Sequence, residues 1–119
     1  MKRSIEDTPI VFLGAGNLAT NLAKALYRKG FRIVQVYSRT EESARTLADE
    51  VEAEYITDLK EVSKEARLYI ISLKDAAFVE LLPQITEGKQ HALLVHTAGS
   101  IPMNIWEGYA ERYGVFYPM

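Results

Sequence analysis

A short apolar run over residues 10–13 leads directly into the segment G-A-G-N-L-A, residues 14–19, which precedes a helical pattern. This is a G-x-G-x-x-A motif between a predicted strand and a predicted helix. In such a motif Gly14 permits the tight turn, Gly16 lets a ligand approach the backbone, and Ala19 lets the helix pack close to the sheet. A glycine turn can precede any helix, but this context favours the first unit of a parallel α/β sheet.

The rest of the chain alternates apolar runs with helical stripes. The predicted strands cover residues 10–13, 32–37, 54–56, 68–73, 92–96 and 115–117. The predicted helices cover residues 18–28, 41–51, 57–66, 78–85 (kinked or shortened by Pro83) and 105–110. We expect an α/β fold with a doubly wound, mainly parallel sheet of strand order 3-2-1-4-5-6. The aromatic residues at helical spacing are expected in the core, with Trp106 facing a second domain as the alternative.

The composition bounds the class of protein. The chain has 119 residues, 48% of them hydrophobic and 25% charged, as in a single globular domain. The net charge of −2 disfavours a nucleic-acid partner, which requires a strongly basic face. The sequence contains no cysteine, which excludes disulfides, zinc fingers, iron–sulfur clusters and thiol catalysis. We predict no metal site.

The two ends of the sequence bear on location and completeness. No apolar signal core follows the basic N-terminus, and no apolar run approaches the roughly 20 residues that span a membrane. We therefore expect a cytoplasmic protein without a membrane partner. The sequence stops on an apolar stretch, residues 115–119, where a complete domain rarely ends. Residues 1–119 are thus expected to be one domain of a longer protein.

The glycine turn also predicts a ligand. A helix that begins after such a turn presents free N–H groups and the positive end of its dipole, which bind phosphate. Gly14, Gly16 and the backbone of Asn17 and Leu18 are therefore predicted to hold the pyrophosphate of a dinucleotide.

The end of the second predicted strand discriminates between dinucleotides. An NAD site usually carries Asp or Glu there to bind the ribose 2′-hydroxyl. Here the residues are Ser38, Arg39 and Thr40, and the first carboxylate is Glu41. Arginine forms a bidentate pair with a 2′-phosphate, and hydroxyls add donors, so we predict NADP as the cofactor. A solvated Arg39 without a ligand is the alternative.

The fourth and fifth predicted strands end at the same edge of the sheet, where ligands of open α/β sheets bind. Ser72, Leu73 and Lys74 are predicted along the nicotinamide ribose, with Thr97 and Ala98 near the ring. His96, Thr97 and Ser100 are candidates for the reacting centre, whereas His91 is expected at the surface. Ordinary turn, cap and solvated roles are equally weighted alternatives for these loop residues.

Four segments carry a family resemblance: G-A-G-N at 14–17, S-R-T at 38–40, A-G at 98–99 and Y-P-M at 117–119. They resemble the N-terminal domain of pyrroline-5-carboxylate reductase, the deazaflavin-dependent NADP oxidoreductases and the β-hydroxyacid dehydrogenases. The stretches 96–103 and 113–119 look most like bacterial Rossmann-like proteins that carry a C-terminal domain of unknown function. Together the similarity runs from about Pro9 to Met119.

This resemblance implies an all-helical C-terminal domain that dimerises and completes the active site. We therefore expect a homodimer formed through that domain, and a fragment that is inactive alone. Two departures limit the transfer. The reductase pattern has Asn where Ser38 stands, and it continues with Asn after the proline, where Met119 stands. Because of these departures, the resemblance does not identify the substrate.

Two functions share this predicted cofactor site. The first is the NADP-binding domain of an oxidoreductase that transfers hydride to or from a small-molecule substrate. The second is a non-catalytic NADP-binding sensor or regulatory domain, because the sequence offers no convincing acid–base pair and leaves the catalytic residues unknown. A methyltransferase that binds adenosylmethionine is disfavoured, since it would want an acidic residue where residues 38–40 read S-R-T.

Overall fold

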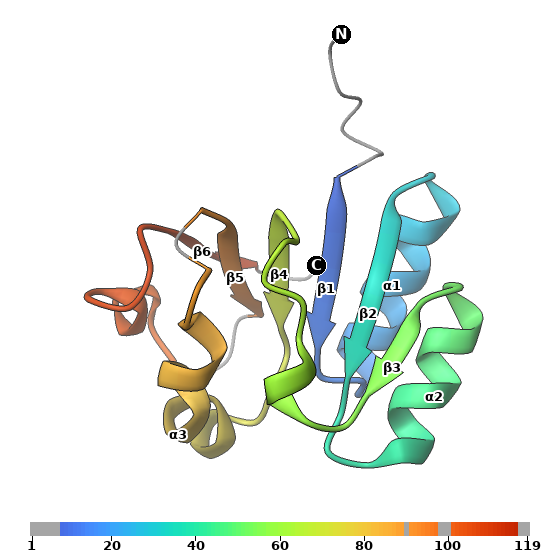
Figure 1. Ribbon diagram of the computed structural model, residues 1–119, viewed down its shortest axis with the longest axis horizontal. Helices are drawn as coiled ribbons and strands as arrows, with labels where there is room; N and C mark the ends of the chain where they lie inside the picture. Colours follow the sequence, from blue (N-terminus) through green and yellow to red (C-terminus); the bar gives the residue numbers. More distant parts are fainter. Residues whose placement is uncertain (1–7, 90, 98–100, 117–119) are drawn as a thin grey trace, which may run out of the picture.

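Six parallel strands form one sheet in the order β3-β2-β1-β4-β5-β6 in the computed structural model, which describes residues 8–89, 91–97 and 101–116 (Figure 1). The predicted strand order is confirmed. The strands are β1 (Pro9–Leu13), β2 (Arg32–Tyr37), β3 (Glu54–Ile56), β4 (Leu68–Ile71), β5 (Leu93–Thr97) and β6 (Arg112–Phe116). The sheet runs outwards from β1, where the strand order reverses direction.

Helices cover both faces of the sheet (Figure 1). On one face lie α1 (Asn17–Arg28) and α2 (Glu41–Glu50), and on the other lie α3 (Asp75–Thr86) and the 3₁₀ turns η2 (Leu59–Glu61) and η3 (Met103–Trp106). Successive residues of a strand point to opposite faces. Accordingly, Ile10 and Phe12 pack on the α1 side, and Val11 and Leu13 pack on the α3 side. This double coverage explains why residues 10–13 form an uninterrupted apolar run.

The predicted helix over residues 57–66 is wrong, because only the single 3₁₀ turn η2 forms there. Side chains from the sheet satisfy the backbone of this segment. The amide of Gln35 accepts from the N–H of Ser63 at 2.7 Å and donates to the carbonyl of Glu61 at 3.2 Å. The hydroxyl of Tyr69 donates to the carbonyl of Ser63. These bonds replace those that a helix would make.

Three further expectations need correction. The predicted helix over residues 105–110 is only the 3₁₀ turn η3, and the backbone at Gly108 has a φ of +84° that ends it. The last strand, β6, consequently begins at Arg112 rather than at 115. Pro83 does not shorten its helix below the predicted residues 78–85, since α3 extends from Asp75 to Thr86.

Trp106 is fully buried beside His96 and Phe78. The alternative that Trp106 faces a second domain is therefore wrong. Its indole N–H donates to Nδ1 of His96 at 2.9 Å, and Nε2 of His96 lies 3.0 Å from the carbonyl oxygen of Ile101. An indole nitrogen can only donate, so Nδ1 accepts and Nε2 carries the proton that Ile101 accepts. Both nitrogens of His96 are thus engaged within the core, and the expectation that His96 reaches a reacting centre is wrong.

We predict that Trp106→Phe destabilises the fold by about 1 to 3 kcal/mol, because it removes the buried donor that Nδ1 of His96 requires. Urea unfolding followed by circular dichroism measures this loss. Tyr109→Phe is the matched control, since Tyr109 is exposed, and it should change the free energy of unfolding by less than about 0.5 kcal/mol. Equal stabilities of the two variants would contradict the assigned role of the indole.

Candidate functional site

The strands β1, β2 and β4 end side by side at the point where the strand order reverses (Figure 1). A crevice opens at these strand ends. Open α/β sheets bind ligands at such a switch point, because the helices that follow adjacent strands diverge to opposite faces. The cavity has a volume of about 470 Å³. It is lined by Gly14, Ala15, Gly16, Tyr37, Ser38, Arg39, Ser72, Leu73, Lys74, Ala77, Glu80 and Leu81.

Gly14 joins the ends of three strands. Its N–H donates to the carbonyl of Tyr37 at 2.7 Å, while the N–H of Ser72 donates to the carbonyl of Leu13 at 2.7 Å. Its φ is +118°, and a Cβ at this position would lie 2.2 Å from the carbonyl oxygen of Ser72. A side chain is therefore excluded by both the backbone conformation and the approach of β4.

Gly16 differs from Gly14 in what surrounds it. It is the N-cap of α1, with a φ of −76° that any residue can adopt. A Cβ at Gly16 would meet no heavy atom within 4 Å, so the protein's own packing does not require glycine there. The open space lies at the N-terminus of α1, whose first turn contains no acidic residue. This geometry fits a phosphate group that approaches the backbone closely.

The end of β2 places Ser38 and Arg39 on the crevice wall. Ser38 is half-buried, and its backbone N–H donates to the carbonyl of Ile56 at 3.2 Å. Arg39 is exposed, and within the described ranges no carboxylate lies at ion-pair distance from it. Thr40 is the N-cap of α2 and does not line the crevice, although its N–H lies 3.4 Å from Oγ of Ser38.

The ends of β4 and β5 supply the opposite wall. Ser72, Leu73 and Lys74 line the crevice, and Lys74 is also the N-cap of α3. Thr97 does not line the crevice, but its hydroxyl donates to Oγ of Ser72 at 3.4 Å. Ala98 lies outside the described residues. Asn17 and Leu18 form the first turn of α1 next to Gly16, but their side chains do not line the cavity.

Sequence reasoning missed the contribution of α3. Ala77, Glu80 and Leu81 line the crevice from this helix, together with Tyr37 from β2. Residues 77 and 81 are spaced i, i+4, so they share one helix face. This spacing could have indicated the crevice wall from the sequence. It was not recognised, because Leu81 also belongs to the apolar stripe by which α3 packs on the sheet. The small and apolar side chains give the crevice a surface suited to a flat ring.

No group of three or more His, Asp or Glu side chains within residues 8–89, 91–97 and 101–116 has the arrangement of a metal site. Over the same ranges, none of the helices has the length and hydrophobicity that crossing a bilayer requires.

Residues 9–99 match a protein family described as coenzyme F420-dependent NADP oxidoreductases. The chain belongs to this family. The match extends from β1 to the end of β5 and includes every residue that lines the crevice. The resemblance to deazaflavin-dependent NADP oxidoreductases is thereby confirmed, and with it an oxidoreductase domain of the Rossmann type.

One protein of known structure that is similar to this chain is a putative NADP oxidoreductase from Bacteroides fragilis. It is 78% identical with a TM-score of 0.94, over 98% of this chain and 45% of that one. Prephenate dehydrogenase of A. aeolicus, in complex with hydroxyphenyl propionate and NAD⁺, shares the fold at 20% identity and a TM-score of 0.77, over 94% and 42%. Glutamyl-tRNA reductase of Methanococcoides burtonii is 27% identical over 96 residues, which are 76% of this chain and 23% of that protein. The chain thus spans less than half the length of each.

The two glycines of the turn should respond differently to the same substitution. We predict that Gly14→Ala lowers the free energy of unfolding by about 2 kcal/mol or more, because the new Cβ is strained and collides with Ser72. Gly16→Ala should change it by less than about 1 kcal/mol, since the conformation suits alanine and the space is empty. Urea denaturation of both variants tests the contrast. A large loss for Gly16→Ala would show that packing within the protein requires this glycine.

Proposed function

We propose that this domain binds NADP and serves an oxidoreductase that transfers hydride between the nicotinamide and a small-molecule substrate. The observation that carries the proposal is one crevice holding both the open space at Gly16 and the side chain of Arg39. The first feature suits a pyrophosphate and the second a 2′-phosphate. When bound, NADP supplies the hydride, while the protein contributes binding, orientation and electrostatics.

The turn between β1 and α1 holds the pyrophosphate in this proposal. Gly14 fixes the turn, Gly16 leaves room for the phosphate, and the N–H groups of Asn17 and Leu18 donate to it. No side chain caps this end of α1. The backbone donors at the start of the helix are therefore directed toward the ligand, and the dipole of α1 favours its negative charge.

The preference for NADP over NAD rests on the end of β2. Arg39 there is exposed, and its planar guanidinium can pair with a phosphate through two parallel hydrogen bonds. The hydroxyl of Ser38 is the adjacent donor, and Thr40 follows it. The carboxylate on the crevice wall, Glu80, comes from α3 and not from the end of β2 where an NAD site places one.

The far side of the crevice takes the nicotinamide half in this proposal. Ser72, Leu73 and Lys74 lie along its ribose, with Thr97 and Ala98 near the ring. The bond between Thr97 and Ser72 supports this arrangement, because it holds the ends of β5 and β4 together.

The adenine ring is the other flat group of the dinucleotide. Ala77 and Leu81 on α3 offer apolar contacts to this ring.

A regulatory role with the same cofactor is the second candidate. The observation that favours it is that both ring nitrogens of His96 are bonded to Trp106 and Ile101. This imidazole is therefore not available as a proton donor in the crevice. A proton donor for catalysis would then come from elsewhere, and a C-terminal helical domain that forms a homodimer is our proposal for its source. Turnover with reduced NADP by the full-length protein separates the two roles.

Calorimetric titration with NADPH, NADP, NADH and NAD tests the cofactor assignment. We predict that NADPH binds more tightly than NADH, and that Arg39→Ala removes this preference. Loss of a charge-assisted contact should cost about 1.5 to 3 kcal/mol, which corresponds to roughly 10- to 150-fold in affinity. Arg45→Ala is the matched control, because Arg45 is an exposed arginine of α2 outside the crevice.

A further substitution separates the pyrophosphate site from the 2′-phosphate site. Gly16→Ala should weaken all four nucleotides alike, since its Cβ fills the space that the pyrophosphate needs. Equal affinity of unmodified protein for NADH and NADPH, unaltered by Arg39→Ala, would contradict the assignment of NADP. Full affinity of Gly16→Ala for every nucleotide would contradict the crevice itself as the binding site.

A further inference from the structure

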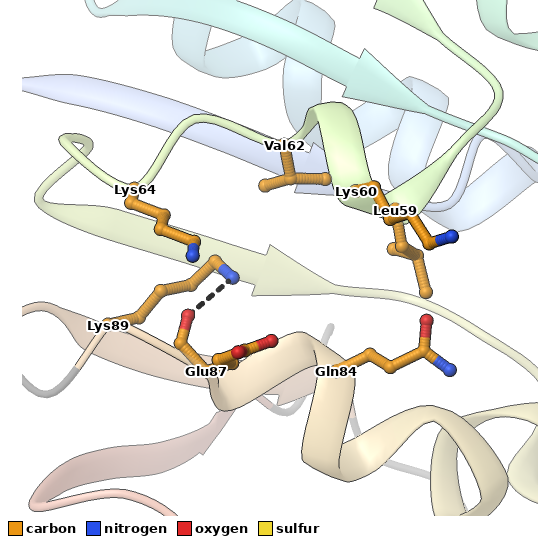
Figure 2. Close-up of a pocket in the computed structure, with 7 residues that line it drawn as sticks. All are labelled: Leu59, Lys60, Val62, Lys64, Gln84, Glu87 and Lys89. Atoms are coloured by element: carbon orange, nitrogen blue, oxygen red, sulfur yellow. Dashed lines mark hydrogen bonds between the residues drawn. The ribbon is translucent and has the colours of Figure 1, made fainter.

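A second cavity lies on the α3 side of the sheet, between the segment that contains η2 and the C-terminal end of α3 (Figure 2). Its volume is about 280 Å³, and it shares no lining residue with the crevice. It is lined by Leu59, Lys60, Val62, Lys64, Gln84, Glu87 and Lys89. Three of these seven residues are lysines and one is a glutamate, so the lining carries a formal charge of +2.

Lys89 is a buried lysine with few partners. The residue is 2% exposed, and Nζ donates to the backbone carbonyl of Glu87 at 3.3 Å. Nζ also lies 5.5 Å from the centroid of the Tyr69 ring. An ammonium has three N–H donors, and burying a charge is costly unless acceptors surround it. Further acceptors would therefore stabilise Lys89 in its charged form.

The electrostatic surroundings of Lys89 are unfavourable for its charge. Burial lowers the pKa of Lys89, the ammonium of Lys64 lowers it further, and Glu87 opposes them with a smaller effect. Burial raises the pKa of Tyr69 to about 12, so this phenol is neutral and brings no negative charge. Within the described part of the chain, no carboxylate lies at ion-pair distance from Lys64 or Lys89.

Gly88 allows the two lysines to lie together. Its φ is +74°, and a Cβ there would lie 2.9 Å from Cδ of Lys64. The aliphatic part of Lys64 thus runs close to the backbone of Gly88. Figure 2 shows that the ammonium groups of Lys64 and Lys89 both extend toward the same part of the cavity. The two like charges repel each other, as the lowered pKa of Lys89 reflects, and an anion between them would offset that cost.

We infer that this cavity binds a small oxyanion of the phosphate type between Lys64 and Lys89. Charge-assisted hydrogen bonds from two ammonium groups to one anion satisfy donors that the protein leaves open. Lys60 and Gln84 line the other end of the same cavity (Figure 2). The ligand is either free phosphate or the phosphoryl group of a small metabolite. This site is independent of the proposed dinucleotide site.

The test is a titration of the ¹⁵N-labelled chain with inorganic phosphate at constant ionic strength, with chloride as the replaced anion. We expect saturable shifts of the amide resonances of Gly88 and Lys89. Lys89→Met, which retains an apolar stem, and Lys64→Gln should each weaken this binding at least about tenfold. Lys29→Gln is the matched control, because Lys29 is exposed at the C-terminal end of α1.

A parallel titration with glycerol 3-phosphate distinguishes the two ligand sources. Tighter binding than inorganic phosphate assigns the site to a phosphorylated metabolite, and equal or weaker binding assigns it to the free ion. Circular dichroism confirms that both lysine variants are folded. The inference is overturned if neither ligand gives saturable shifts, if Lys64→Gln and Lys89→Met bind like the control, or if the shifts are confined to residues 14–16.

Discussion

The backbone contact between the turn after β1 and the end of β4 is the constraint on which the rest of the structure depends. At Gly14 the carbonyl of Ser72 comes so close that a Cβ would lie 2.2 Å from it. The same turn is bonded to the end of β2 through the carbonyl of Tyr37. Three strand ends are thereby fixed at one point, and α1 and α3 begin from it on opposite faces of the sheet. The crevice is the space that this divergence leaves.

The glycines at positions 14 and 16 therefore have separate roles, although both belong to one motif. Gly14 is required by the protein's own packing, whereas Gly16 faces space that no protein atom fills. Because packing does not require glycine at position 16, binding of a ligand is a reason for glycine to be there. The adjacent donors at the start of α1, together with Arg39 at the end of β2, give that space a chemistry suited to phosphate groups.

The sequence predicts the sheet well because its strands are covered on both faces. Residues 10–13 and 68–71 are apolar throughout, and such runs reveal buried parallel strands without an alignment. The predicted helix at 57–66 fails because Gln35 and Tyr69, distant in sequence, bond to the backbone of that segment. Tertiary hydrogen bonds of this kind leave no local signal.

The site is predictable to the extent that it lies at strand ends. Of the residues expected there, seven line the crevice: Gly14, Gly16, Ser38, Arg39, Ser72, Leu73 and Lys74. The wall supplied by α3 was missed because a helical stripe indicates burial but not the neighbour against which it packs. The prediction that His96 reaches the reacting centre failed because its position was known but its hydrogen-bond partner was not. Its position at the end of β5 is correct, but its partner Trp106 is ten residues further along the chain.

A crystal structure of this domain with NADPH would show directly whether the crevice at Gly16 and Arg39 is an NADP site. We expect the pyrophosphate in the open space at Gly16 and the 2′-phosphate within hydrogen-bond distance of the guanidinium of Arg39. A complex in which the nucleotide lies outside the crevice, or its 2′-phosphate points away from Arg39 into solvent, would contradict that claim.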